Sequence, residues 1–133
     1  MTAGYRMSRQ CSNCGDRPKP RPPPRTLPDD LRQALAVNTT FVLVAEVEAQ
    51  IVGSIIGTFD GWRGNIYRLA VHPDYRRQGV ARALVAEVEQ RLAQHGAKRT
   101  TALVEKAYPW AMTFWEAVGY RVDERIVRCV RNL

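Results

Sequence analysis

The hydrophobic pattern of the chain changes its period near residue 79, and this change limits the folds that the sequence can adopt. Before it, β-branched and apolar residues form three strand-like runs at 41–47, 51–59 and 66–71. After it, apolar residues recur at helical spacing from Val80 to Leu92, and Gly96 supplies a stop signal. Because each element must cover its apolar face, these runs predict a sheet with a long helix packed on it.

The rest of the chain adds shorter elements to this centre. A capped helix is predicted from Pro28 to about Asn38, a strand at 100–105, a helix from Pro109 to Ala117 that closes at Gly119, and an alternating strand at 121–130. The first two strand runs are three residues apart, which predicts an antiparallel hairpin. The order β-β-β-α-β-α-β predicts an α+β fold with a mixed, mostly antiparallel sheet and flanking helices.

Residues 1–27 differ from the rest in composition. Six of the eight prolines lie between Pro18 and Pro28, and proline excludes both helix interior and central strand. We therefore expect a disordered, basic, Pro-rich tail at 1–27 and one folded domain at 28–133. The remaining 106 residues are enough for a single core without disulfides or metal.

The formal net charge of +7 is distributed unevenly. The tail at 1–27 carries six basic residues and one acidic residue, a net of +5, which leaves only +2 for the folded part. A basic groove on the domain is therefore weakly supported, and no nucleic-acid partner is expected, although a nucleic-acid role for the tail itself stays open. The longest apolar run, Phe41 to Ala45, is too short for a membrane span, and no secretory signal is visible. We expect a cytoplasmic protein.

The three cysteines do not form a complete metal-binding pattern. Cys11 and Cys14 are spaced like half of a zinc knuckle, but no second pair lies nearby, and Cys129 is isolated, as are both histidines. No metal is expected, and the thiols are interpreted as reduced side chains.

The joint between the third strand and the long helix has the composition of an anion site. It contains Arg76 and Arg77 followed by Gly79 at the start of the helix. A helix start presents unpaired N–H groups and a positive dipole end, and glycine allows a bulky phosphate to approach the backbone. The segment lacks both the P-loop and the dinucleotide-binding pattern. A solvated basic turn remains the alternative at this point.

Two motifs give this segment a family resemblance. The run Arg76-Arg-Gln-Gly79-Val-Ala81 resembles motif A of the GCN5-related N-acetyltransferases (GNAT), R/Q-x-x-G-x-G/A, and residues 67–75 resemble the preceding strand and its exit. Residues 111–120, AMTFWEAVGY, resemble the family signature A-x-x-F-Y-E-K-L-G-F. The likeness covers about 28–133, and the loop at 60–64 is most similar to small bacterial acetyltransferases of the YpeA-like type.

The resemblance implies a site for acetyl-CoA as cosubstrate. In this family the strands that match 66–71 and 100–105 splay apart, pantetheine lies between them, and the helix amides hold the pyrophosphate. The cofactor-binding residues implied are Leu69, Ala70, Val71, Arg76, Arg77, Gln78, Gly79, Val80, Ala81, Arg82 and Trp115. The implied reaction is direct attack of a neutral amine on the thioester, which requires no cysteine nucleophile.

The chain departs from the family pattern at the catalytic positions. Trp115 stands where the family often has a general-acid tyrosine, so Tyr108 is the candidate acid. Glu105 is the candidate base, acting through water, and Asp60 is a weaker one. The first strand and first helix of the family are expected to be missing, which a homodimer, a misassigned start or loss of catalysis would each explain.

The functional prediction is transfer of an acetyl group from acetyl-CoA to a primary amine, either a protein N-terminus, a lysine or a small amine. The alternative is a non-catalytic acyl-CoA-binding or interaction module. The substituted tyrosine and the altered N-terminus favour that alternative.

Overall fold

A computed structural model describes residues 6–8 and 28–133 of the chain. Its elements are β1 (Arg6–Ser8), α1 (Pro28–Leu35), β2 (Thr40–Val47), β3 (Gln50–Phe59), β4 (Gly64–Val71), the short 3-10 helix η1 (Pro73–Tyr75), α2 (Val80–Gln94), β5 (Thr100–Ala102) and α3 (Pro109–Ala117). The chain divides into two compact units at residues 103 and 104, and each is described by itself.

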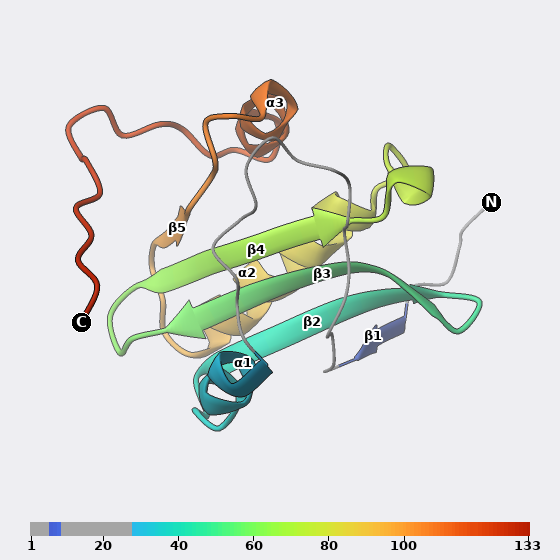
Figure 1. Cartoon of the computed structure of the whole chain (residues 1–133), viewed down its shortest axis with the longest axis horizontal. Coiled ribbons are helices and arrows are strands. Elements are labelled where there is room, and N and C mark those ends of the chain that lie inside the picture. The colour runs from blue at the N-terminus through green and yellow to red at the C-terminus, as the bar shows by residue number, and fades with distance from the viewer. Residues whose placement is uncertain (1–5, 9–27) are drawn as a thin grey trace. The chain divides into compact units, whose positions relative to one another are not determined.

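The first unit is built on a five-stranded sheet in the order β1-β2-β3-β4-β5 (Figure 1). All neighbouring strands are antiparallel except β4 and β5, which are parallel. The expected α+β class and the mixed, mostly antiparallel sheet are therefore confirmed. The hairpin between β2 and β3 turns through Glu48 and Ala49, whose φ angles are 49° and 64°. Positive φ at two successive residues suits the right-handed twist of a tight hairpin.

The helix α2 covers one face of this sheet with the apolar stripe that the sequence predicted (Figure 1). Its buried residues are Val80, Leu84, Val85, Val88 and Leu92. Three strand glycines face it, and a Cβ atom on Gly53, Gly57 or Gly64 would lie 2.9, 2.7 or 2.8 Å from a side-chain carbon of α2. The helix therefore lies against the backbone of β3 and β4, closer than any larger strand residue would allow.

The N-terminal expectation was wrong at one strand. The sequence predicted a disordered tail and a missing first strand, but the structure pairs Arg6–Ser8 with β2, Arg6 opposite Glu46 and Ser8 opposite Val44. Three residues are too short for a period of two to be visible, so sequence pattern alone did not mark them. The proline run and both tail cysteines, Cys11 and Cys14, lie outside the described residues.

The predicted C-terminal strand at 121–130 was also wrong. No strand is assigned after β5 in the described chain, and β5 itself ends at Ala102, earlier than expected. Asp123 folds the segment into a turn, since its Oδ1 accepts the Arg125 N–H at 3.2 Å and its carboxylate binds the Arg125 guanidinium at 3.0 Å. Alternating residues make a strand only when a neighbouring strand pairs with them.

No helix in the described part of the chain combines the length and the hydropathy that crossing a bilayer requires.

The close approach of α2 to the sheet gives a stability prediction. Gly57→Ala should lower the free energy of unfolding by about 1–3 kcal/mol, because the added methyl meets Val88 Cγ1 at 2.7 Å. Urea unfolding measures the loss. In a Val88→Ala background the same change should cost clearly less, because the colliding methyl groups are gone. An equal cost in both backgrounds would contradict the packing described above.

Candidate functional site

The strands β4 and β5 pair at only one end. Their parallel register covers Gly64, Asn65 and Ile66 of β4, and the last bond runs from the Leu103 N–H to the Ile66 carbonyl at 3.2 Å. The strand β4 continues to Val71, so its second half has no described neighbour on that edge. The pairing therefore ends within β4, in the stretch where the family resemblance implied that the two strands separate.

The exposed half of β4 directs specific backbone groups toward the open edge. The His72 N–H donates to the Val52 carbonyl of β3 at 2.7 Å. Because backbone groups alternate between the two edges of a strand, the amides and carbonyls of Leu69 and Val71 point away from β3, toward the open edge. Ala70 pairs opposite Ser54 of β3. An extended polar ligand could therefore add to this edge as a strand would.

A bulge interrupts β4 beside that edge. Ile56 of β3 pairs with Tyr67, and Ser54 pairs with Ala70, so one residue of β3 faces two of β4. Arg68 takes the left-handed conformation there, with φ 55°. A non-glycine residue with positive φ costs free energy and occurs often at functional sites. No sequence signal marked this bulge, because bulges of this kind usually carry glycine.

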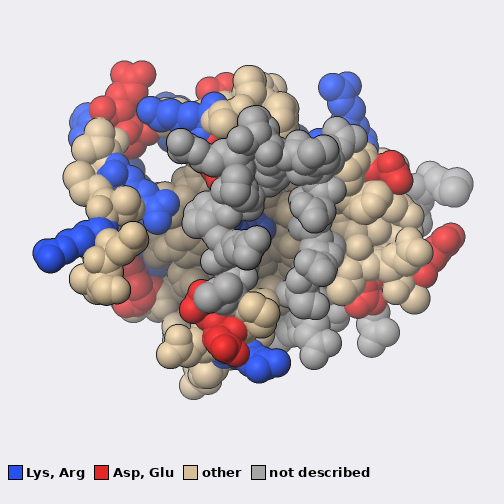
Figure 2. Space-filling model, viewed as in Figure 1, with Lys and Arg blue, Asp and Glu red and all other residues tan. Residues whose placement is uncertain are grey.

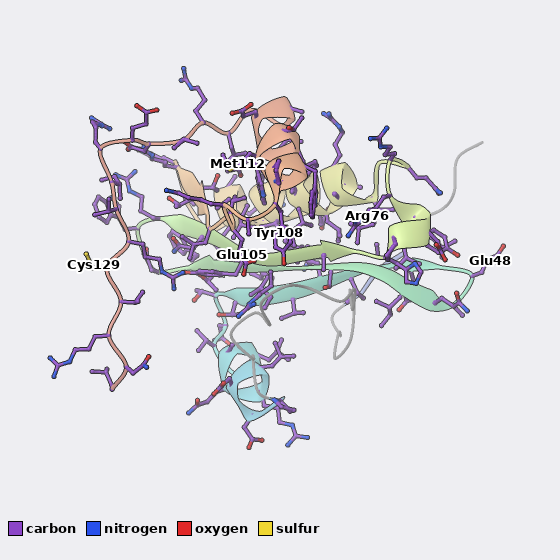
Figure 3. The ribbon with its side chains drawn as sticks, turned by 45° about the horizontal axis from the view of Figure 1, so that its top comes forward. Glu48, Arg76, Glu105, Tyr108, Met112 and Cys129 are labelled. Atoms are coloured by element: carbon purple, nitrogen blue, oxygen red, sulfur yellow. The ribbon has the colours of Figure 1, made fainter. Side chains whose placement is uncertain are left out.

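The loop after β4 is a short, internally bonded corner. The His72 Nδ1 atom accepts the Asp74 N–H at 3.1 Å, and the His72 and Tyr75 rings meet edge to face at 5.8 Å. Gln78 Nε2 donates to the Asp74 carbonyl at 3.3 Å. These contacts join β4 to α2 over a few residues, and Figure 3 shows Arg76 at this corner.

The N-terminus of α2 presents a row of backbone amides. Gly79 is the N-cap with φ 83°, and no side chain of the described chain caps the helix. The first intrahelical bond runs from the Ala83 N–H to the Gly79 carbonyl at 3.0 Å. Among the described residues no acceptor is found for the amides that precede it, those of Arg77, Gly79, Val80, Ala81 and Arg82. Such a row, at the positive end of a helix dipole, binds anions.

The same corner has space and positive charge. No heavy atom lies within 4 Å of a Cβ built on Gly79, so this glycine opens to solvent. Arg76, Arg77 and Arg82 are exposed beside it, and Arg77 is itself left-handed with φ 60°. The corner therefore fits a diphosphate, because backbone amides and guanidinium groups lie around open space. Both kinds of group can donate hydrogen bonds directly to phosphate oxygens.

The second unit, residues 104–133, carries the candidate catalytic side chains. The Tyr108 N–H donates to the Glu105 carbonyl at 3.3 Å, and Tyr108 is the N-cap residue of α3. Figure 3 shows both on the segment that enters this helix. Tyr108 is half-buried and Glu105 exposed. The two candidate catalytic residues are therefore held at the two ends of one turn.

Trp115 is the buried residue of α3, only 7% exposed. Its indole meets the Tyr120 ring edge to face at 4.8 Å and the Phe114 ring at 5.4 Å. Its N–H has no acidity comparable to that of a phenol. At the position where the family resemblance implied a tyrosine, Trp115 is therefore a packing residue.

Asp60 is poorly suited to accept a proton. Its Oδ1 accepts the N–H groups of Arg63 at 2.7 Å and Trp62 at 2.8 Å. These bonds favour the ionised carboxylate and hold the pKa of Asp60 below its ordinary value. The loop at 60–63 is therefore organised by Asp60, and the weaker base candidate loses its support.

Charge on the described surface does not form a single basic area in one view. In Figure 2 the coloured Lys and Arg side chains are interspersed with Asp and Glu. The described residues also hold no group of three or more His, Cys, Asp and Glu side chains arranged for a metal ion.

Sequence comparison relates the chain to a known family. The model of the acetyltransferase (GNAT) family matches residues 8–120. An acetyltransferase of Sodalis glossinidius (strain morsitans) is 35% identical over 104 residues, which is 78% of this chain and 73% of that relative. An acetyltransferase of Yersinia pestis (strain Pestoides F) is 36% identical over 98 residues, 74% of this chain and 70% of that relative.

Solved structures share the fold at lower sequence identity. An aminoglycoside acetyltransferase from an uncultured soil metagenomic sample, in complex with trehalose, superposes with a TM-score of 0.68 at 24% identity, over 86% of this chain and 78% of that one. Aminoglycoside N-acetyltransferase AAC(6')-Iy in complex with CoA gives 0.69 at 16% identity, over 79% and 75%.

The family match begins at residue 8 and spans both motifs that the sequence singled out. It includes the diverging strands, the Gly79 corner and all of α3. The chain belongs to the GNAT family and is an N-acetyltransferase that uses acetyl-CoA as its cosubstrate.

Proposed function

We propose that this enzyme acetylates a primary amine by direct attack on the thioester, with the acceptor drawn from protein N-termini, lysines and small amines. One observation carries the proposal: the pairing of β4 with β5 ends after Ile66, beside a helix start whose amides have no acceptor among residues 6–8 and 28–133. A linear cofactor that ends in a diphosphate needs both features, an edge for its amide-bearing arm and an anion site for its phosphates.

In this proposal the backbone does most of the cofactor binding. Leu69 and Val71 pair with the amide groups of pantetheine, and Ala70 holds that stretch of β4 to β3. The amides from Arg77 to Ala81 bind the diphosphate, while Arg76, Arg77 and Arg82 add positive charge and Gln78 braces the loop through Asp74. Val80 anchors the helix start in the core, where it is 2% exposed.

The bulge in β4 has a catalytic part in this proposal. Acetyl-CoA supplies an activated acyl group whose carbonyl oxygen gains negative charge during attack. A backbone N–H that the bulge turns toward the open edge stabilises this charge, as oxyanion donors do. The arrangement requires Arg68 to adopt a left-handed backbone conformation, with φ 55°, which costs free energy.

Two protons must move during transfer. An alkylamine is largely protonated at neutral pH, so Glu105 accepts a proton from the acceptor through a water molecule. The Tyr108 hydroxyl then protonates the departing thiolate, in place of the family tyrosine that Trp115 replaces. Trp115 contributes apolar surface to the thiol end of the cofactor and to the packing of α3.

The cofactor corner can be tested with an acidic substitution. Gly79→Glu should weaken acetyl-CoA binding at least about tenfold, because a carboxylate would block the amides and repel the diphosphate. Isothermal titration calorimetry with acetyl-CoA measures the change.

The matched control for this test is Gly96→Glu, at the other end of α2. Gly96 has φ 101° and, like Gly79, no heavy atom within 4 Å of a Cβ built on it. Both variants therefore carry similar backbone strain, but only Gly79 lies at the proposed anion site. Equal affinities in the two variants would place the diphosphate elsewhere.

The role of Tyr108 predicts a selective loss of turnover. Tyr108→Phe should lower kcat roughly 100-fold and leave the KM of acetyl-CoA unchanged, because it removes the proton donor and keeps the ring. Free-thiol release measures both constants. Tyr120→Phe serves as control, since it also removes a hydroxyl from this unit but keeps the ring that packs on Trp115. An unaltered kcat in Tyr108→Phe would assign the proton to another donor.

Direct attack makes the cysteines dispensable. A variant with Cys11, Cys14 and Cys129 all changed to Ser should retain acetyl transfer, because no acyl group is carried on a thiol. Cys129 is exposed and unpaired by any disulfide within the described residues. Loss of transfer in this variant, with its fold and acetyl-CoA affinity intact, would refute direct attack.

A further inference from the structure

The segment that leads into α3 carries a carboxylate, Glu105, followed by an aromatic pair at the start of the helix. The ring centroids of Tyr108 and Trp110 are 4.8 Å apart at an interplanar angle of 47°. Trp110 is 58% exposed although it is a large apolar side chain. Glu105 begins the turn that precedes the helix, because its carbonyl accepts the Tyr108 N–H at 3.3 Å. Three side chains with affinity for organic cations thus arise from six consecutive residues.

The Glu105 carboxylate has no cationic partner in the described part of the chain. No hydrogen bond or ion pair of its side chain is found there, whereas Asp123 of the same unit binds Arg125 at 3.0 Å. Lys106 follows directly and is exposed. The negative charge of Glu105 is therefore available to a ligand, with Lys106 as the nearest competing charge in sequence.

Trp62 is an exposed indole that already holds a cation over its ring. It is 70% exposed, and the Arg63 guanidinium carbon lies 4.2 Å from its ring centroid. Trp110 is similarly exposed but has no such cation among the described residues. The two tryptophans therefore differ in one respect that matters for binding, since one indole face already holds a cation and the other does not.

We propose that Trp110 and Glu105 bind a positively charged nitrogen of the acceptor, so that the substrate is a molecule with at least two amino groups. This inference rests on the proposed function, which already uses Tyr108 as the acid and Glu105 as the base. In this proposal the Glu105 carboxylate both balances the charge of the bound ammonium and accepts, through water, the proton of the attacking amine. One nitrogen is held as an ammonium over the indole and beside the carboxylate. Its charge lowers the pKa of the other amine, which raises the neutral fraction that can attack.

A quaternary ammonium ion tests this recognition alone, because it can be neither deprotonated nor acetylated. Tetramethylammonium chloride is titrated into the full chain up to roughly 0.1 M, where exposed cation–π contacts become populated, against sodium chloride at matched ionic strength. The readout is the indole N–H resonances of the three tryptophans, assigned by single substitution. We expect the Trp110 resonance to shift and those of Trp62 and Trp115 to stay in place.

Two charge variants sharpen the result. Glu105→Gln should weaken tetramethylammonium binding roughly two- to fivefold, the size of an exposed ionic contact, and Lys106→Gln should strengthen it. A Trp110 resonance that does not move, or that moves no more than Trp62, would overturn the proposal and leave an aromatic pair that only packs. Equal affinity in Glu105→Gln would overturn the part assigned to the carboxylate.

The same sample separates this inference from the function on which it rests. Acetyl-CoA added at the end of the titration should shift the amides of residues 79–82 if the cofactor corner is correct. If tetramethylammonium leaves the Trp110 indole resonance unchanged while acetyl-CoA shifts the amides of 79–82, the cation site alone is refuted. If acetyl-CoA leaves those amide resonances unchanged, the cofactor site is refuted, whatever the Trp110 resonance does.

Discussion

The packing of α2 against glycine-bearing strands is the constraint on which the rest of the first unit depends. With Gly57 opposite Val88 and Gly64 opposite Leu92, the helix lies directly on the backbone of β3 and β4. That contact holds the start of α2 beside the end of β4, with only a short bonded corner between them. A helix N-terminus attracts anions wherever it lies, but here it lies next to an open strand edge. Core packing thus creates the geometry that binding requires.

The open edge has its own physical cause. A parallel pair ends where one strand turns away, and β5 stops at Ala102 while β4 continues to Val71. The unpaired backbone groups that result would be a liability on an ordinary edge strand. The bulge at Arg68 also interrupts the regular hydrogen bonding between β3 and β4, which changes the direction of backbone N–H and C=O groups there. In the proposed function this irregularity of β4 serves ligand binding, at some expense of sheet regularity.

The roles proposed for the second unit fall on the segment that enters α3. Proline at Pro109 begins the helix and leaves Tyr108 extended at the N-cap, with φ −117°. Glu105 begins the preceding turn and Trp110 lies in the first turn of the helix, so the proposed proton transfer and acceptor recognition would fall within six residues. Trp115 lies further along α3, where it is buried and packs against neighbouring rings.

The amino-acid pattern was enough to predict the fold class, the hairpin of β2 and β3, the apolar stripe of α2 and the glycine at the start of that helix, because these depend on local periodicity and on turn residues. It missed β1, and it predicted a strand at 121–130 that the structure lacks, because strand formation requires a partner elsewhere in the chain. Three features came from the folded chain alone: the point where the pairing of β4 with β5 ends, the bulge at Arg68 and the hydrogen bonds by which Asp60 orders its loop. Each of these depends on hydrogen bonds that join backbone groups in a particular register or turn, and side-chain pattern carries little information about them.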